Sequence, residues 1–189
     1  MVKNVSPQMT TEEITALALE SGFTSAAPLE MSSLVFRPEV REMCSADKCR
    51  SYAKCWSCPP ACGSLESITS RAASYSSGII VQTTGSMEDD FDMAAIRDTM
   101  LEHKKYFDNF VRQMRLIKGN CLPMGAGACT RCRKCTYPDR PCRHPDRLYP
   151  SMEAYGLWVS DVCTRSGLGY NYGPQTITYT SCILYDQEQ

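Results

Sequence analysis

Long apolar runs are absent from this 189-residue sequence, and no stretch reaches the roughly 18 consecutive apolar residues that cross a bilayer. An excess of charge of one sign is also missing, because the formal net charge at pH 7 is −1. A chain with this balance has no electrostatic reason to bind nucleic acid or an anionic membrane. Residues 1–7 lack the apolar segment of a signal peptide. We therefore expect a cytoplasmic protein, with neither nucleic acid nor membrane as a partner.

Histidine is scarce too, since only His103 and His144 occur. No carboxylate pattern accompanies them that would indicate a catalytic triad. We expect His103 on the polar, solvated face of a helix, whereas His144, two residues after Cys142, is a candidate for ligating a metal or moving a proton. Residues 125–128 are glycine-rich but lack the third glycine of a dinucleotide-binding fingerprint. The sequence therefore excludes that class of site.

Cysteine, by contrast, is abundant, with 12 residues in the chain. Five lie between positions 44 and 62 and five between 121 and 142, while Cys163 and Cys182 stand alone. In a reducing compartment such clusters serve as metal ligands, whereas in a secreted chain they would form disulfides. Because no export signal supports a disulfide framework, we interpret both clusters as metal-binding.

The C-terminal cysteine group places three thiols within seven residues and a fourth shortly after: Cys129, Cys132, Cys135 and Cys142. Such a tight triple is typical of iron–sulfur ligation, whereas zinc more often uses two separated Cys-x-x-Cys pairs. Six basic and two acidic residues lie between positions 129 and 147, so this segment carries a formal charge of +4. Positive charge near cluster sulfurs favours the reduced state. We therefore predict a [4Fe–4S] cluster on these four thiols. The arginines of this segment are suited to binding an acidic redox partner or an anionic substrate; the alternative is that they are simply solvated.

The N-terminal cysteine group offers five candidates, which exceeds the four ligands that a site needs. Our preferred set is Cys44, Cys49 and Cys58, with Cys55 or Cys62 as the fourth ligand. Three protein thiolates would leave one metal position open to a substrate. The spacing from Cys55 to Cys58 also suits a zinc knuckle, so zinc is the alternative to a second iron–sulfur centre here.

The remaining thiols have a simpler interpretation. We expect Cys121 and Cys182 to be core residues, and Cys163 to be a buried apolar thiol on a helix. Cys163 has an alternative role in capping a cluster packed against that helix. Gly156, within the same predicted helix, hints at a close neighbour because glycine is unfavourable in a helix interior.

Periodicity and end signals divide the chain into alternating helices and strands. Helices are predicted over residues 11–21, 64–74, 90–118 and 151–164. Strands are predicted over residues 33–36, 78–84 and 176–185. A further short strand is predicted from residue 121, and it runs into the glycine-rich loop. This order predicts a single α/β or α+β domain over residues 1–189, with its core at about 35–185, a mixed sheet with packed helices, and cysteine-rich metal-binding loops.

Six short motifs occur together in a fixed order, at residues 41–44, 49–52, 56–60, 127–136, 142–145 and 151–156. This combination resembles a cysteine-rich family of predicted metal-binding proteins, domain of unknown function 2284, found in anaerobic bacteria and archaea. The resemblance covers roughly residues 35–185. It implies a metal site, which we expect to be iron–sulfur, in the cytoplasm of an anaerobe, and it names no substrate.

The resemblance also implies which thiols belong to the family motifs: Cys44, Cys49, Cys58, Cys129, Cys132, Cys135 and Cys142. Cys55 and Cys62 lie outside those motifs, so they are treated as secondary. The function we expect is [4Fe–4S]-based electron transfer to a partner protein, or reduction of a small substrate by an iron–sulfur oxidoreductase. The alternatives are a zinc-stabilised binding module and a metal carrier or sensor.

Overall fold

The two longest strands, β2 (Ser77–Ser86) and β4 (Thr176–Tyr185), form the centre of a four-stranded sheet with the order β1-β2-β4-β3. They pair antiparallel along their whole length, from Ser77 opposite Tyr185 to Ser86 opposite Thr176. Branched and aromatic residues dominate both strands, which suits a pleated, buried surface. The computed structural model describes residues 9–186.

The two edge strands are short. β1 (Ser25–Pro28) pairs with β2, and β3 (Cys121–Met124) pairs with β4, again antiparallel in both cases. The predicted class, one mixed helix-and-strand domain with cysteine-rich loops, is confirmed. All pairs of named strands are antiparallel, so the sheet is not mixed as predicted. The chain segments between paired strands are long, and each brings the chain back in the opposite direction.

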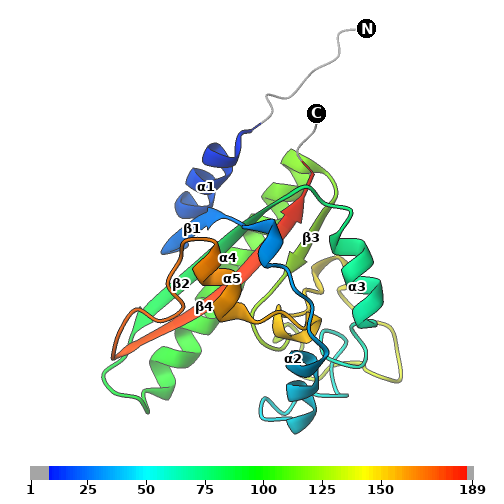
Figure 1. The fold of residues 1–189 in the computed structure, drawn as a ribbon. Helices are drawn as coiled ribbons and strands as arrows, with labels where there is room; N and C mark the ends of the chain where they lie inside the picture. Colours follow the sequence, from blue (N-terminus) through cyan, green and yellow to red (C-terminus); the bar gives the residue numbers. More distant parts are fainter. Residues whose placement is uncertain (1–8, 187–189) are drawn as a thin grey trace, which may run out of the picture.

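Helices cover both faces of this sheet (Figure 1), with α5 (Val159–Arg165) in front of it and α4 (Met93–Lys118) behind. The face that carries Ile79 and Val81 packs against α4 and α1 (Thr11–Glu20), and the opposite face, which carries Ile80, packs against α5 and α3 (Leu65–Ala72). Alternate strand residues thus enter two separate cores, as the period of two requires.

Local end signals explain where the predicted helices begin and end. α1 has a capping box, in which the Thr10 hydroxyl and the Glu13 carboxylate each accept a backbone N–H of the other residue. The Asp92 carboxylate caps α4, and Gly119 ends it with a φ of 68°. α1, α3, α4, β2, β3 and β4 therefore lie where the sequence predicted them.

Two predicted elements differ in the structure. Residues 33–36 form no strand beyond a single bridge from Phe36 to Leu157, and a 3-10 turn, Met31–Ser33, precedes them. The helix predicted over 151–164 is split into a 3-10 turn (Glu153–Tyr155) and α5. Gly156 separates the two with a φ of 86°, and a Cβ there would lie 2.7 Å from the Arg37 carbonyl oxygen. The close neighbour that we expected at Gly156 is thus the backbone of Arg37.

Both cysteine groups lie on irregular chain outside the sheet. The first follows α2 (Pro38–Glu42) and begins with Cys44 inside the 3-10 turn Met43–Ala46, and the second follows β3. Figure 1 shows the two segments side by side at the end of the sheet toward which β3 points. A hydrogen bond from Trp56 Nε1 to the Arg140 carbonyl oxygen, 3.1 Å long, joins them. Among residues 9–186, the structure contains no helix that is both long and apolar enough to cross a membrane.

Candidate metal centre

The preferred N-terminal thiols share one cavity. Cys44, Cys49 and Cys58 all line a space of about 630 Å³. Cys49 is exposed, Cys44 is half-buried and Cys58 is buried, so the three thiols differ in their access to solvent. Cys62 does not line it; its thiol lies 3.7 Å from the Ala154 carbonyl oxygen instead. Cys62 therefore lies behind the wall of this cavity, within electrostatic range of Cys44 and Cys55.

Apolar and aromatic residues form most of the wall of this cavity, among them Met43, Tyr52, Leu157, Trp158 and Tyr170. Apart from the cysteines, the ionisable side chains that line it with a formal charge at pH 7 are Lys48 and Glu153. A cavity of this size, lined mostly by apolar groups with few polar ones, is typical of a small-molecule site.

The C-terminal thiols surround a second, much narrower space. Cys129, Cys132, Cys135 and Cys142 all line a hollow of about 30 Å³. Basic residues and His144 complete its wall, and the His144 backbone N–H donates to the Cys142 sulfur at 3.4 Å.

Cys55 lies in the C-terminal hollow and not in the N-terminal cavity. It was predicted as a possible fourth ligand of the N-terminal group, because the sequence spacing alone places it beside Cys58. The two thiols lie in contact but border different spaces: Cys58 lines the large cavity, whereas Cys55 lines the hollow and also contacts Cys129. Cys55 is thus the residue whose place the sequence did not indicate.

Ser57 is the point where the two groups meet. Its hydroxyl accepts the Cys129 backbone N–H at 3.1 Å and lies 3.2 Å from the Cys55 sulfur and 3.8 Å from the Cys58 sulfur. Ser57 is only 1% exposed. A buried hydroxyl with these partners fixes the N-terminal turn against the start of the C-terminal loop.

The three thiols at this junction are electrostatically unequal. Hydrogen bonds from the Cys129 and Cys58 thiols lower the pKa of Cys55, against the effect of burial. The same bonds to Cys55, together with burial, raise the pKa of Cys129 and of Cys58. Cys55 thus differs from Cys129 and Cys58 in the direction of its pKa shift, because both of those thiols lie within hydrogen-bonding distance of it.

Lys104 of α4 places a cation behind this junction. Its ammonium group donates to the Ala128 carbonyl oxygen. Burial lowers the pKa of Lys104, whereas negative charge on the neighbouring cysteines Cys129, Cys55 and Cys58 would raise it. A partly buried cation of this kind offsets the negative charge that thiolate ligands gather.

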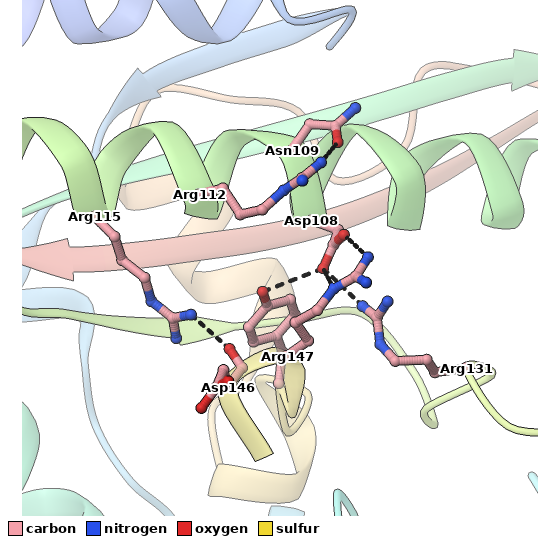
Figure 2. Close-up of polar contacts among 8 residues, drawn as sticks. Asp108, Asn109, Arg112, Arg115, Arg131, Asp146 and Arg147 are labelled. Atoms are coloured by element: carbon pink, nitrogen blue, oxygen red, sulfur yellow. Dashed lines mark hydrogen bonds and ion pairs between the residues drawn. The ribbon is translucent and has the colours of Figure 1, made fainter. Parts of the chain in front are cut away.

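Asp108 anchors the C-terminal loop to α4, as Figure 2 shows. Its carboxylate accepts from Arg131 Nη2 at 2.7 Å, from Arg147 Nε at 3.0 Å and from the Tyr149 hydroxyl at 3.2 Å. Burial opposes its ionisation, but Arg147 and Arg131 outweigh burial and lower the pKa of Asp108. The ends of the cysteine loop are thus tied to one buried carboxylate.

Sequence reasoning missed Asp108, although one signal was present. Asp108 is a carboxylate next to Phe107 and within the stripe that includes Phe110 and Val111, three residues that face the core. A charged residue at the edge of an apolar stripe needs a partner, and the surplus of arginine between residues 129 and 147 supplied one. No comparable signal marked Ser57.

The fit of these residues to a metal depends on donor type and placement. Across residues 9–186, no group of three or more His, Cys, Asp or Glu side chains is arranged around a point where one metal ion would sit. The cysteines instead line two spaces as free thiols. Cysteine thiols are suitable donors for zinc and for iron–sulfur centres alike, so the chemistry of the donors fits a metal of either kind. Around the hollow, the residues that would hold it are Cys129, Cys132, Cys135 and Cys142.

The thiols predicted to lie in the core do so. Cys121, Cys163 and Cys182 are buried, and burial raises the pKa of each. The Gln82 amide donates to the Cys163 sulfur at 3.4 Å. Cys163 lines neither cysteine-bearing space, so the structure does not place it as a cap on a cluster.

His103 was predicted to be solvated, and this is wrong. The residue is fully buried between the sheet and α4. Its Nδ1 lies 2.9 Å from the Thr83 hydroxyl and its Nε2 lies 2.7 Å from the Ser181 hydroxyl. Burial lowers the pKa of His103 to about 3. Helical periodicity misassigned its face because these polar partners come from strands distant in sequence.

The family model of predicted metal-binding proteins, domain of unknown function 2284, matches residues 27–185. The chain belongs to this family, which confirms the resemblance and supports metal binding as its general property. No curated protein and no solved structure matches the chain.

Proposed function

We propose that this protein is an iron–sulfur redox protein with a [4Fe–4S] cluster on Cys129, Cys132, Cys135 and Cys142. We place a second metal centre at Cys44, Cys49 and Cys58 and propose that a small substrate is reduced in the 630 Å³ cavity beside it. When bound, the cluster supplies reversible one-electron storage. A redox partner protein supplies the electrons.

The observation that carries this proposal is the junction at Ser57. One hydroxyl contacts Cys55 and Cys58 and accepts the backbone N–H of Cys129, so the two cysteine groups adjoin each other. Electron transfer between two centres needs a short separation within the protein. A purely structural pair of metal staples would need no such contact.

The cavity supports the second half of the proposal. Three thiols on its wall are one short of a closed four-ligand site, which leaves a metal position accessible to a substrate. Apolar residues form most of the wall around them. Glu153 is the only carboxylate among the lining residues, and its carboxyl group is the donor we assign for a proton that accompanies reduction.

The local charge around the C-terminal group fits a cluster that accepts electrons. Arg131, Arg143 and Arg147 line the hollow that holds the four thiols. Positive charge and N–H donors near cluster sulfurs stabilise the reduced state. The cytoplasm is the compartment we propose, because all twelve cysteines are free thiols in the structure.

The test is metal and sulfide analysis with electron paramagnetic resonance on anaerobically purified protein. We expect Cys132→Ser to abolish the [4Fe–4S] signal and Cys49→Ser to remove only the second centre. Cys182→Ala, a core thiol outside both groups, should retain the iron and sulfide of the wild type. Zinc without iron or sulfide would refute the proposal in favour of a zinc-stabilised binding module, and metal that is readily lost on desalting would indicate a carrier or sensor.

A further inference from the structure

A separate cavity of about 370 Å³ lies between α4 and the loop that follows β3. One side consists of Leu101, Lys104, Asp108 and Arg112, which recur at helical spacing along α4. The other side is residues 125–131, with Arg147 and Tyr149 completing the wall. None of the residues that hold the N-terminal centre contributes to it.

This cavity is strongly cationic. Its lining includes five basic side chains and one acidic side chain, so the formal charge of its wall is +4 in a chain of net charge −1. The basic residues are Lys104, Lys105, Arg112, Arg131 and Arg147. Cations that line a concave space of low dielectric raise the local concentration of anions.

Asp108 does not neutralise this wall fully. Its Oδ1 already accepts three hydrogen bonds and its Oδ2 accepts one from Arg147. Arg131 Nε remains buried without a hydrogen-bond partner. A buried N–H without an acceptor is unfavourable, and a guanidinium group binds a planar or tetrahedral oxyanion through paired donors. Arg131 therefore has an unpaired donor beside the cavity, which a small rotation of its guanidinium group would bring to a bound anion.

Apolar groups line the rest of the space. Leu101, Phe107 and Tyr149 face it, and the rings of Phe107 and Tyr149 meet edge to face at 5.6 Å. A volume near 370 Å³ is at the small end of the range for ligand sites, roughly 300–1,000 Å³. The wall thus suits a small molecule with an oxyanion at one end and an apolar body.

We propose that this cavity binds a small organic anion, with its carboxylate or phosphate on Arg131 and its apolar body against Leu101, Phe107 and Tyr149. The inference goes beyond the redox proposal and does not depend on which metal the cysteines hold. Cys129, Arg131 and Arg147 line both this cavity and the C-terminal cysteine hollow. A bound anion therefore lies against the shared wall and alters the electrostatic field at the metal centre.

The experiment is isothermal titration calorimetry on the metal-loaded protein as purified, with benzoate, phenyl phosphate and neutral benzamide as probes. We expect saturable binding of at least one anion, and the two anionic arms distinguish a carboxylate site from a phosphate site. Benzamide should bind at least tenfold more weakly. Equal binding of benzamide, or no saturable binding of either anion at millimolar concentration, overturns the proposal.

Two variants localise the site. Arg131→Lys keeps a cation beside Asp108 but removes the paired donors, so anion affinity should fall at least tenfold. Leu101→Trp fills the space from a half-exposed position without touching the Asp108 contacts, and it should abolish binding even if Arg131→Lys fails to fold. Arg97→Gln is the matched control, because this exposed residue of α4 lies outside the cavity. Unchanged affinity in Leu101→Trp would place the anion elsewhere.

Discussion

The buried His103 makes the stability of this protein depend on pH below neutrality. Both ring nitrogens lie within hydrogen-bonding distance of the buried hydroxyl groups of Thr83 and Ser181, which suit a neutral ring. Burial, and secondarily the charge of Lys104, lowers the pKa of His103 from 6.5 to about 3. The folded chain therefore excludes a proton that the unfolded chain binds readily.

The sign and size of the effect follow from linkage. A depressed histidine pKa leaves stability intact above the unfolded value of 6.5, and stability is lost as the pH falls from there toward 3. Between pH 7 and pH 5 the unfolded state takes up nearly one proton that the folded state refuses. Integrated over that window, His103 lowers the free energy of unfolding by about 2 kcal/mol.

The assay is urea unfolding of the metal-loaded wild type and of His103→Gln, each at pH 7 and pH 5 without oxygen. Titration of other groups and any loss of metal affect both proteins, so the difference between them isolates His103. The wild type should lose about 2 kcal/mol more than the variant between the two pH values. Phe107→Leu, which alters the ring stacked on His103, should weaken the protein equally at both pH values. Identical pH dependence of wild type and His103→Gln would refute the buried, neutral histidine.

The elements that the sequence predicted well are those whose signals are local. α4 shows an apolar stripe, a capping carboxylate at Asp92 and a terminating Gly119, all within its own segment. β2 and β4 are runs of branched residues that would form strands beside almost any partner. β1 escaped prediction because Ser25–Pro28 carries little strand propensity and exists through its pairing with β2.

The candidate site divides in the same way. The sequence placed the thiols on two loops, and the structure has a cysteine-lined space beside each loop. The sequence did not indicate that Cys55, which lies beside Cys58, also contacts Cys129, because only the fold brings the two loops together. Asp108 and Ser57 act on chain segments distant in sequence, so their partners became visible only once β3 and α4 were packed together.

Two further predictions concern the supports of the site. Asp108→Asn leaves two arginines without their buried carboxylate, so the free energy of unfolding should fall by about 3 kcal/mol. The variant should also lose its metal faster to a chelator. Stability equal to that of the wild type would show that the ion pairs are dispensable. Gly156→Ala should destabilise the protein more than Gly167→Ala in urea unfolding. Both glycines have positive φ, but an added Cβ meets the Arg37 carbonyl oxygen at 2.7 Å only at Gly156, whereas it meets open space at Gly167. The second variant therefore bears only the left-handed backbone strain of roughly 1 kcal/mol, and equal losses in the two would contradict the close approach of the chain at Gly156.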